Sequence, residues 1–141
     1  MKITFLVADE VRQEMGGKQT ILGLYADGVI MLDLISQNAK PIGDLPPGID
    51  RLSFSINVSE LVGKHRFKGQ IINPSGKIYG SEIPLGESDI TSAYASRSFI
   101  VEAKPFVVSE KGTYHFNLYI DDELHAFPFT IIDRVEQKQA L

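Results

Sequence analysis

The sequence predicts an all-β protein, an immunoglobulin-like β-sandwich of about seven to nine mostly antiparallel strands with little or no helix. Residues 110–132 combine a Gly-x-Tyr entry, an alternating strand, an acidic turn and a second strand, which is the closing hairpin of many such sandwiches. Most of the remaining chain divides into short segments separated by turn-forming residues. The one helix candidate, residues 88–98, is rich in serine and threonine, which are weak helix formers, so we expect it to be mostly extended.

The first strand of the closing hairpin alternates with a period of two, which is typical of a strand with one buried face. The face expected in the core carries Tyr114, Phe116, Leu118 and Ile120, and the other carries His115, Asn117 and Tyr119. Tyr114 stands where immunoglobulin-like domains place the tyrosine whose hydroxyl binds the preceding corner. We therefore expect its hydroxyl to bind a carbonyl among residues 107–110.

The second strand of this hairpin alternates as well, with Phe127, Phe129 and Ile131 on one face. Pro128 cannot donate a ladder hydrogen bond, so this strand is predicted to lie at a sheet edge or to bear a bulge. The chain has neither cysteine nor tryptophan. The similarity is therefore to the sandwich architecture and not to antibody domains, whose core holds a Cys–Trp–Cys set.

The N-terminal segments are predicted to form a meander. Strands are expected at residues 3–11, 19–25 and 29–33, with turns at residues 14–18 and 26–28. Gly16 and Gly17 suit the first turn because glycine adopts positive φ at little steric cost. Residues 29–33 are expected to continue the meander.

Residues 34–50 contain several prolines and glycines and are predicted to be a long connection, which either bridges the two sheets or carries function. The clearest alternation follows. Leu52, Phe54, Ile56 and Val58 are expected to face the core, and Ser53, Ser55 and Asn57 to face outward. Further strands are expected at residues 64–73, 78–85 and 92–104.

Length and composition predict one domain over residues 1–133, followed by a polar tail at residues 134–141 that frays. The first apolar run, residues 3–8, is too short to cross a membrane. A net charge of −4, with basic residues scattered singly, argues against nucleic acid as a partner. The absence of cysteine is compatible with the cytosol, and we expect a cytoplasmic protein that binds no membrane.

The N-terminal third carries a further pattern. Asp9 and Arg12 precede the Gly17-Lys18 turn, an apolar-Gly-apolar-aromatic strand follows at residues 22–25, and the later chain has an Asn-Pro-x-Gly turn at residues 73–76 and the Gly-x-Tyr entry at residues 112–114. In these motifs the sequence resembles an uncharacterised bacterial β-sandwich family, a domain of unknown function. The resemblance covers most of the chain. It implies a compact β-sandwich and no assigned activity.

No metal or cofactor site is predicted. The positions of His115 and His125 would allow them to approach each other across the closing hairpin, and histidines on adjacent strands can bind zinc. No third ligand at a metal-binding spacing accompanies them, however, and the acidic residues 87–89 and 121–123 lack the spacing of a calcium loop. We therefore interpret the histidines as surface residues and the acidic segments as solvated turns.

No catalytic residue is predicted either. The chain has no Gly-x-Ser-x-Gly elbow, and the Gly16-Gly17-Lys18 segment does not complete a phosphate-loop pattern. Asp9 and Arg12 are three residues apart on a strand, so their side chains should point to opposite faces. They are therefore not expected to form an acid with an anion-binding partner.

Two hypotheses about function remain. The first is a non-catalytic protein-interaction or structural module, which presents loops or an edge strand to a protein partner or to another copy of itself. The alternative is a small-ligand-binding or enzymatic domain that uses a polar sheet face around His115, Tyr119 and His125. A bound ion in stoichiometric amount would favour the alternative.

Overall fold

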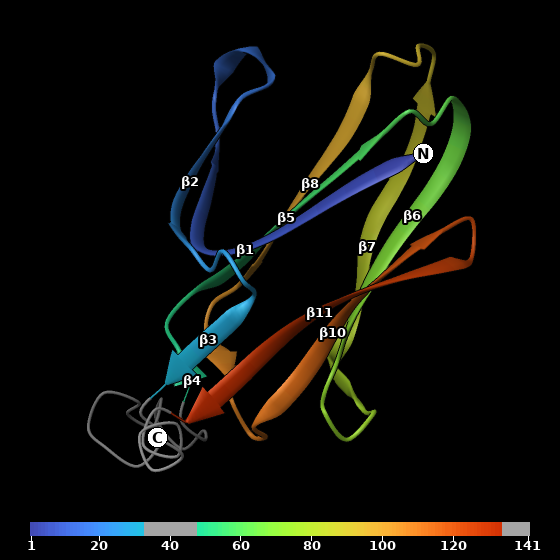
Figure 1. The fold of residues 1–141 in the computed structure, drawn as a ribbon. Helices are drawn as coiled ribbons and strands as arrows, with labels where there is room; N and C mark the ends of the chain where they lie inside the picture. The colour runs from blue at the N-terminus through green and yellow to red at the C-terminus, as the bar shows by residue number, and fades with distance from the viewer. Residues whose placement is uncertain (33–47, 134–141) are drawn as a thin grey trace.

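The computed structural model describes residues 1–32 and 48–133, and it is all-β within these ranges (Figure 1). The strands are β1 (Lys2–Gln13), β2 (Gln19–Leu24), β3 (Val29–Leu32), β4 (Gly48–Ile49), β5 (Leu52–Ser59), β6 (Gly63–Ile72), β7 (Ile78–Ile90), β8 (Ser96–Ala103), β9 (Phe106–Val107), β10 (Gly112–Ile120) and β11 (Glu123–Asp133). Among the described residues the one helical element is a 3-10 turn, Met15–Gly17. The prediction of an all-β chain is confirmed. The predicted tail and most of the connection at residues 34–50 lie outside the described residues.

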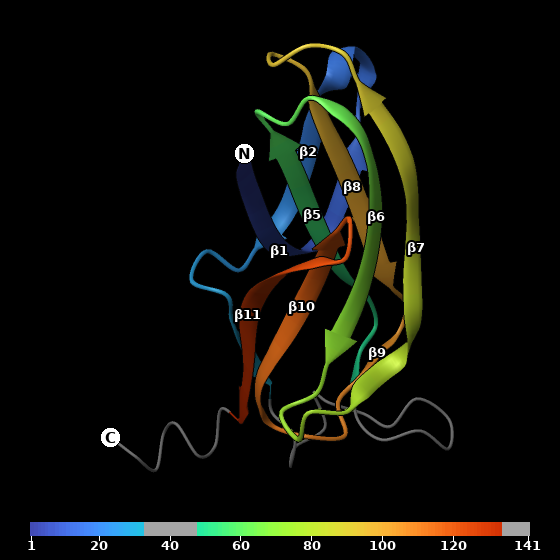
Figure 2. The same ribbon diagram turned by 90° about the vertical axis from the view of Figure 1, so that its right-hand side faces the viewer.

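Two sheets pack against each other as a sandwich (Figures 1 and 2). The four-stranded sheet has the order β2-β1-β5-β8, and the five-stranded sheet has the order β3-β11-β10-β6-β7. The two-residue strands β4 and β9 pair with each other. Among the described strands every pair is antiparallel except β3 with β11, which is parallel.

The core between the sheets is aromatic, and the alternation of β5, β10 and β11 builds it as predicted. Phe54, Phe116 and Phe129 have 0%, 0% and 1% of their surface exposed. The ring centroid of Phe54 lies 5.5 Å from that of Phe116 and 5.2 Å from that of Phe129. Aromatic pairs at this separation add to the free energy gained by burying the rings. These contacts join the two sheets directly.

The closing hairpin is formed by β10 and β11. Tyr114 is fully buried, and its hydroxyl donates a 2.6 Å hydrogen bond to the Glu110 carbonyl, as expected from the sequence. The two turn residues, Asp121 and Asp122, have φ of 51° and 69°. Positive φ at both central residues is what a two-residue type I′ turn requires, and aspartate tolerates it better than most residues.

Pro128 lies on the part of β11 that forms a sheet edge. β3 pairs with β11 only over residues 130–133, so residues 123–129 have β10 on one side and no described strand on the other. The Thr130 amide donates to the Gly28 carbonyl on the β3 side. Every second residue of a strand points its backbone groups to the same side. The ring nitrogen of Pro128 therefore points to the same side as the Thr130 amide, which is the open side at residue 128. The predicted edge is confirmed for this half of the strand.

The predicted N-terminal meander is wrong at its third strand. β3 does not continue the sheet of β1 and β2 but crosses to the other sheet, where it pairs with the end of β11. The turn at residues 25–28 makes the crossing, with the Gly28 amide bound to the Tyr25 carbonyl and Gly28 at a φ of 71°. Local alternation sets which face of a strand is buried but not which sheet the strand joins, and that is why the sequence did not predict the crossing.

The part of the β1–β2 hairpin that begins near Ala8 bends over the outer face of β5, although β1 and β2 belong to the same sheet as β5. Ser53 and Ser55 face away from the core, as predicted, yet both are fully buried. Ser53 Oγ donates to the Asp9 carbonyl at 3.3 Å, and Ser55 Oγ donates to Gln19 Oε1 at 2.6 Å. In Figure 1 the hairpin rises beside β5 and β8 and separates from them toward its tip. The bent part of the four-stranded sheet therefore shields the outer face of β5 from water.

Candidate functional site

One hollow on the described surface lies in the seam between the sheets. It has a volume of about 340 Å³ and is lined by β1, by the turn after β2 and by β11. We call it the seam hollow. Figure 2 shows β1 and β11 on the same side of the molecule, with the turn after β2 beside them.

The edge of β1 at the seam hollow has free backbone groups. The Val7 carbonyl accepts a hydrogen bond from the Tyr25 amide, which lies on the side away from β5. Because backbone direction repeats every two residues, the amide and carbonyl of Phe5 and Ile3 point to the same side. The described part of β2 pairs with β1 only from Ala8 onward. These groups of β1 therefore face no described strand.

The edge of β11 across the seam is open in the same way. Its residues 124, 126 and 128 share the direction of the Thr130 amide, which points toward β3. Leu124 and Ala126 each offer an amide and a carbonyl, while Pro128 offers a carbonyl alone. An added strand can pair with these groups without disturbing the ladder between β10 and β11.

The floor of the seam hollow is apolar. The rings of Phe5 and Phe127 stack with their centroids 5.1 Å apart, and Phe5 also lies 5.7 Å from the core ring of Phe116. Asp27 is the one charged residue among the described lining residues, and its carboxylate already accepts the Val29 amide at 3.0 Å. The chemistry of the seam hollow is therefore that of backbone pairing beside an apolar side-chain site.

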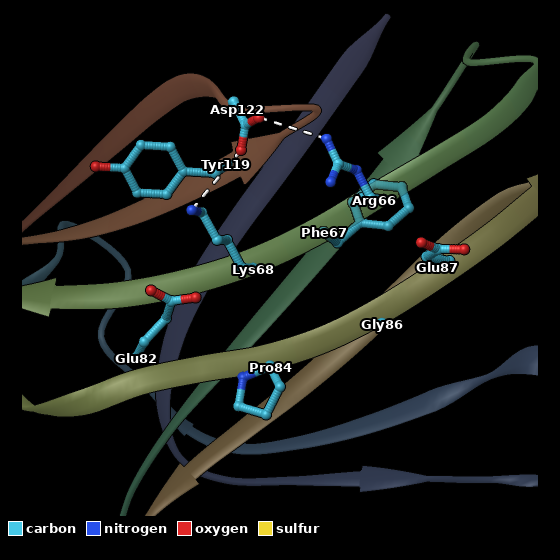
Figure 3. A pocket seen from close by; sticks show the side chains of 9 residues that line it. All are labelled: Arg66, Phe67, Lys68, Glu82, Pro84, Gly86, Glu87, Tyr119 and Asp122. Atoms are coloured by element: carbon cyan, nitrogen blue, oxygen red, sulfur yellow. Dashed lines mark hydrogen bonds and ion pairs between the residues drawn. The ribbon is translucent and has the colours of Figure 1, made fainter.

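The second hollow, the sheet-face groove, lies on the outer face of β6, β7 and β10 and has a volume of about 290 Å³ (Figure 3). Asp122 lies 3.4 Å from Arg66 and 3.7 Å from the Lys68 ammonium. The Lys68 ammonium also lies 5.1 Å from the centre of the Tyr119 ring. Glu82 and Glu87 line the β7 side. The side chains of Arg66 and Asp122 are 64% and 70% exposed, and such surface pairs stabilise a fold by only about 0–1 kcal/mol.

His65 forms a histidine–carboxylate contact that the sequence did not predict. Its Nδ1 lies 2.5 Å from Asp121 Oδ2, and its Nε2 lies 2.9 Å from the Val62 carbonyl. The hydrogen bond to Asp121, followed by that to Val62, raises the pKa of His65 above its usual value. The bonds from the Arg66 amide and from His65 lower the pKa of Asp121. Both ring nitrogens of His65 are bound to groups of the chain, so neither is turned toward a substrate in this structure.

The predicted polar face around His115, Tyr119 and His125 is only partly formed. His115 lies opposite Pro128 and His125 opposite Leu118 in the ladder of the closing hairpin. Directly opposed residues share a face, so His125 lies on the side of the buried Leu118 and His115 on the outer side with Tyr119. The approach that the positions of His115 and His125 allowed does not occur, because the turn sets a register that places them on opposite faces.

The N-terminal motif residues form a structural unit. Arg12 binds Glu10 at 2.9 Å, whereas Asp9 accepts a 2.7 Å hydrogen bond from the Tyr25 hydroxyl. Burial and this bond raise the pKa of Tyr25 to about 12. The Asp9 carboxylate also lies over Gly23, where a Cβ atom would come within 2.2 Å of it. Asp9 thus fastens the two strands of the hairpin together, and it is not paired with Arg12.

Within residues 1–32 and 48–133 no three histidine, cysteine, aspartate or glutamate side chains gather at a spacing suited to a metal ion. Within the described ranges, no helix has the length and apolar character that a membrane span requires. The prediction of no catalytic, cofactor or metal residue remains a prediction.

The fold and these surfaces define a class of protein, a β-sandwich domain with open strand edges at the seam of its two sheets. A family model described as "Family of unknown function (DUF6941)" matches residues 3–132, and the chain belongs to this family. No curated protein matches the chain. The resemblance to an uncharacterised domain is therefore confirmed, and the family supplies no activity.

Proposed function

We propose that this chain is a non-catalytic protein-interaction module that receives an extended segment of a partner protein at the seam hollow. The observation that supports this most is the presence of unpaired backbone groups on two strand edges beside an apolar hollow. An added strand satisfies such groups, and its apolar side chains fill neighbouring sites, which is the mode of strand addition. Pro128 limits pairing with β11 to the residues before it.

The composition supports narrower proposals about the setting. A net charge of −4 disfavours nucleic acid and anionic membrane surfaces as partners. The absence of cysteine agrees with a cytoplasmic location. The Tyr114 corner is a feature shared with immunoglobulin-like domains, and we propose that the sandwich belongs to that architecture.

The proposal is tested by a substitution that removes one free donor. Ala126→Pro eliminates an amide that points to the open side, so the ladder with β10 keeps its hydrogen bonds. Pro128 occupies the equivalent position two residues later, so β11 already accommodates a proline there. Peptides selected from a random displayed library should bind the wild-type protein and Ala126→Val, and should bind Ala126→Pro about tenfold more weakly or worse.

Calorimetric titration with the selected peptides measures this, and amide chemical shifts locate the contact. Shifts confined to residues 3–7 and 124–128 would support strand addition. Equal binding to Ala126→Pro, or a library that yields no peptide for this surface, would refute it. Concentration-dependent dimerisation that Ala126→Pro abolishes would instead identify a second copy of the chain as the occupant.

A second candidate function is small-ligand binding at the sheet-face groove. The Tyr119 ring, with Lys68 above it and Glu82 opposite, offers an aromatic surface among charges, which supports recognition of a small polar ligand. A fragment screen by NMR distinguishes the two candidates. Ligands that shift the resonances of Lys68 and Tyr119, but not those of Phe5 or Ala126, would favour this candidate.

A further inference from the structure

The contact between His65 and Asp121 joins two turns at one end of the sandwich. His65 is the third residue of β6, and its ring is bound both to Val62 in the β5–β6 connection and to Asp121 in the β10–β11 turn. The carboxylate and the carbonyl are both acceptors. Both ring nitrogens must therefore carry a proton for the two hydrogen bonds to exist together.

Asp121 is held by further bonds to β6. Its Oδ1 accepts the Arg66 amide at 2.9 Å, and its own amide donates to the Arg66 carbonyl at 3.0 Å. The side chain of His65 is only 19% exposed, so water competes weakly for the ring. Asp121 is thus fixed to β6 by three contacts, one of which depends on a proton.

This turn leads directly into the open edge of β11. Glu123 is the first residue of the strand, and Leu124 and Ala126 are the first residues with free amides. The neighbouring turn residue, Asp122, also contacts Arg66 and Lys68 in the sheet-face groove. If the turn becomes less ordered, we therefore expect the first residues of β11 to become less ordered before the core does.

We propose that His65 and Asp121 form a proton-dependent clip that fixes the open edge of β11 and thereby controls its capacity to receive a partner strand. This inference rests on the proposed function. With a cationic ring both bonds hold and the edge is ordered. With a neutral ring only one of the two nitrogens can donate, so one of the two bonds is lost and the ring no longer joins the turn to the β5–β6 connection.

The charges around the ring determine where the clip opens. Charged neighbours come from β6, from the β10–β11 turn, from β7 opposite, from the β5–β6 connection and from β8. They are Lys64, Arg66, Asp121, Asp122, Glu123, Glu87, Asp89, Glu60 and Arg97, the last of which donates to Ser88, the residue opposite His65. The bonds to Asp121 and Val62 outweigh the opposing effect of burial, so the pKa of His65 is raised. A raised folded-state pKa means that the clip stabilises the fold below the unfolded pKa of about 6.5. This contribution is lost as the pH rises through the higher folded-state pKa.

NMR on the full chain tests the clip without any partner. Between about pH 5 and pH 9 the ring resonances should show His65 titrating above about 6.5, with both nitrogens protonated below its midpoint. The heteronuclear NOE of residues 121–126 should fall through the same midpoint. His65→Gln should show the low NOE at every pH. His115→Gln, on the outer face of the neighbouring strand, should behave as the wild-type protein.

Several outcomes would overturn the clip. A His65 midpoint at or below about 6.5, or an NOE that does not change across the titration, contradicts it directly. If His65→Gln does not fold, Asp121→Asn provides the same test, because it removes the charge and should shift the midpoint of His65 downward.

The affinity of a selected peptide, measured at a pH below and at a pH above the titration midpoint of His65, separates the two proposals. We expect affinity to fall several-fold above it in the wild-type protein and not to change in His65→Gln. A constant affinity in the wild-type protein refutes the regulatory role. The absence of any peptide binding refutes the proposed function, while the NMR titration still decides whether the clip exists.

Discussion

Tyr114 shows how a single side chain serves both the core and the end of the sandwich. Its ring stacks on that of Phe129 with centroids 5.3 Å apart, and its hydroxyl reaches the Glu110 carbonyl at 2.6 Å. Burial of the phenol raises the pKa of Tyr114 to about 12. The corner that the sequence predicted is therefore a satisfied, buried hydrogen bond, and its loss should be measurable.

Tyr114→Phe keeps the ring and removes the hydroxyl, so it should destabilise the protein by about 1 kcal/mol. Tyr119→Phe is the control, because that side chain lies on the outer face of the same strand and is only partly buried. Its effect should be close to zero. Denaturant midpoints of the two variants check this. Equal effects, or a larger effect at Tyr119, would contradict the assignment of Tyr114 as the corner residue.

Tyr25 and Tyr114 should titrate late. Both Tyr25 and Tyr114 have a pKa raised to about 12, in each case first by burial. A raised folded-state pKa means that stability is fully present below the unfolded pKa of about 10 and is lost as the pH rises through the folded value. Ultraviolet titration of the phenols should show two delayed groups. Tyr25→Phe and Tyr114→Phe should each remove one, and early titration of all five would disprove the burial of both hydroxyls.

Gly23 and Gly76 allow backbone strain to be separated from steric contact. Both have positive φ, 66° and 89°, but a Cβ at Gly23 would meet Asp9 whereas one at Gly76 would meet nothing within 4 Å. Gly76→Ala should therefore cost about 1–2 kcal/mol for the conformation alone. Gly23→Ala should cost more, because Asp9 must also leave the Tyr25 hydroxyl. Thermal unfolding checks the order, and equal losses would show that Asp9 moves aside freely.

At the scale of elements, strands β5 and β10 follow their alternation closely. Leu52, Phe54, Ile56 and Val58 are all fully buried, as are Tyr114, Phe116 and Leu118. Each strand lies in the middle of its sheet, so the face toward the core has no access to water. The sequence is most informative for such central strands, since the buried face imposes a strict period of two.

Truncation of a central ring should be costly. Phe116→Ala removes a side chain that packs against Phe5 and Phe54, and it should reduce stability by about 3–5 kcal/mol. Phe54→Ala and Phe129→Ala should fall in the same range. Thr113→Ala, on the outer side of β10, is the control; it removes only the hydrogen bond to the Thr130 hydroxyl and should change stability by about 1 kcal/mol or less. A loss below about 1 kcal/mol for Phe116→Ala would mean that the site collapses around the missing ring.

At the scale of the whole molecule, the arrangement of the sheets leaves one side open. The seam hollow exists because β1 pairs with β2 only from Ala8 onward, and because β3 pairs only with the last four residues of β11. Two strand edges are then exposed beside a stacked pair of phenylalanines. The proposed function depends on this arrangement of three elements and not on any one residue type.

A chelator should leave the melting temperature unchanged, because the described residues include no cluster of three metal-ligating side chains. Removal of a stabilising ion would lower the melting temperature by mass action. The measurement is a thermal scan with and without EDTA. A decrease of several degrees that one particular ion reverses would establish a metal site.

Sequence alone determined the strand character, the buried faces of β5, β10 and β11, and the Tyr114 corner, because each depends on residues a few positions apart. Only the tertiary structure decided that β3 joins the second sheet, that the β1–β2 hairpin buries Ser53 and Ser55, and that His65 meets Asp121. These features depend on which segments, distant in sequence, come together in space. The period-two pattern predicts which face of a strand is buried. Which strand pairs with it is set by turn geometry and by the packing of the whole chain.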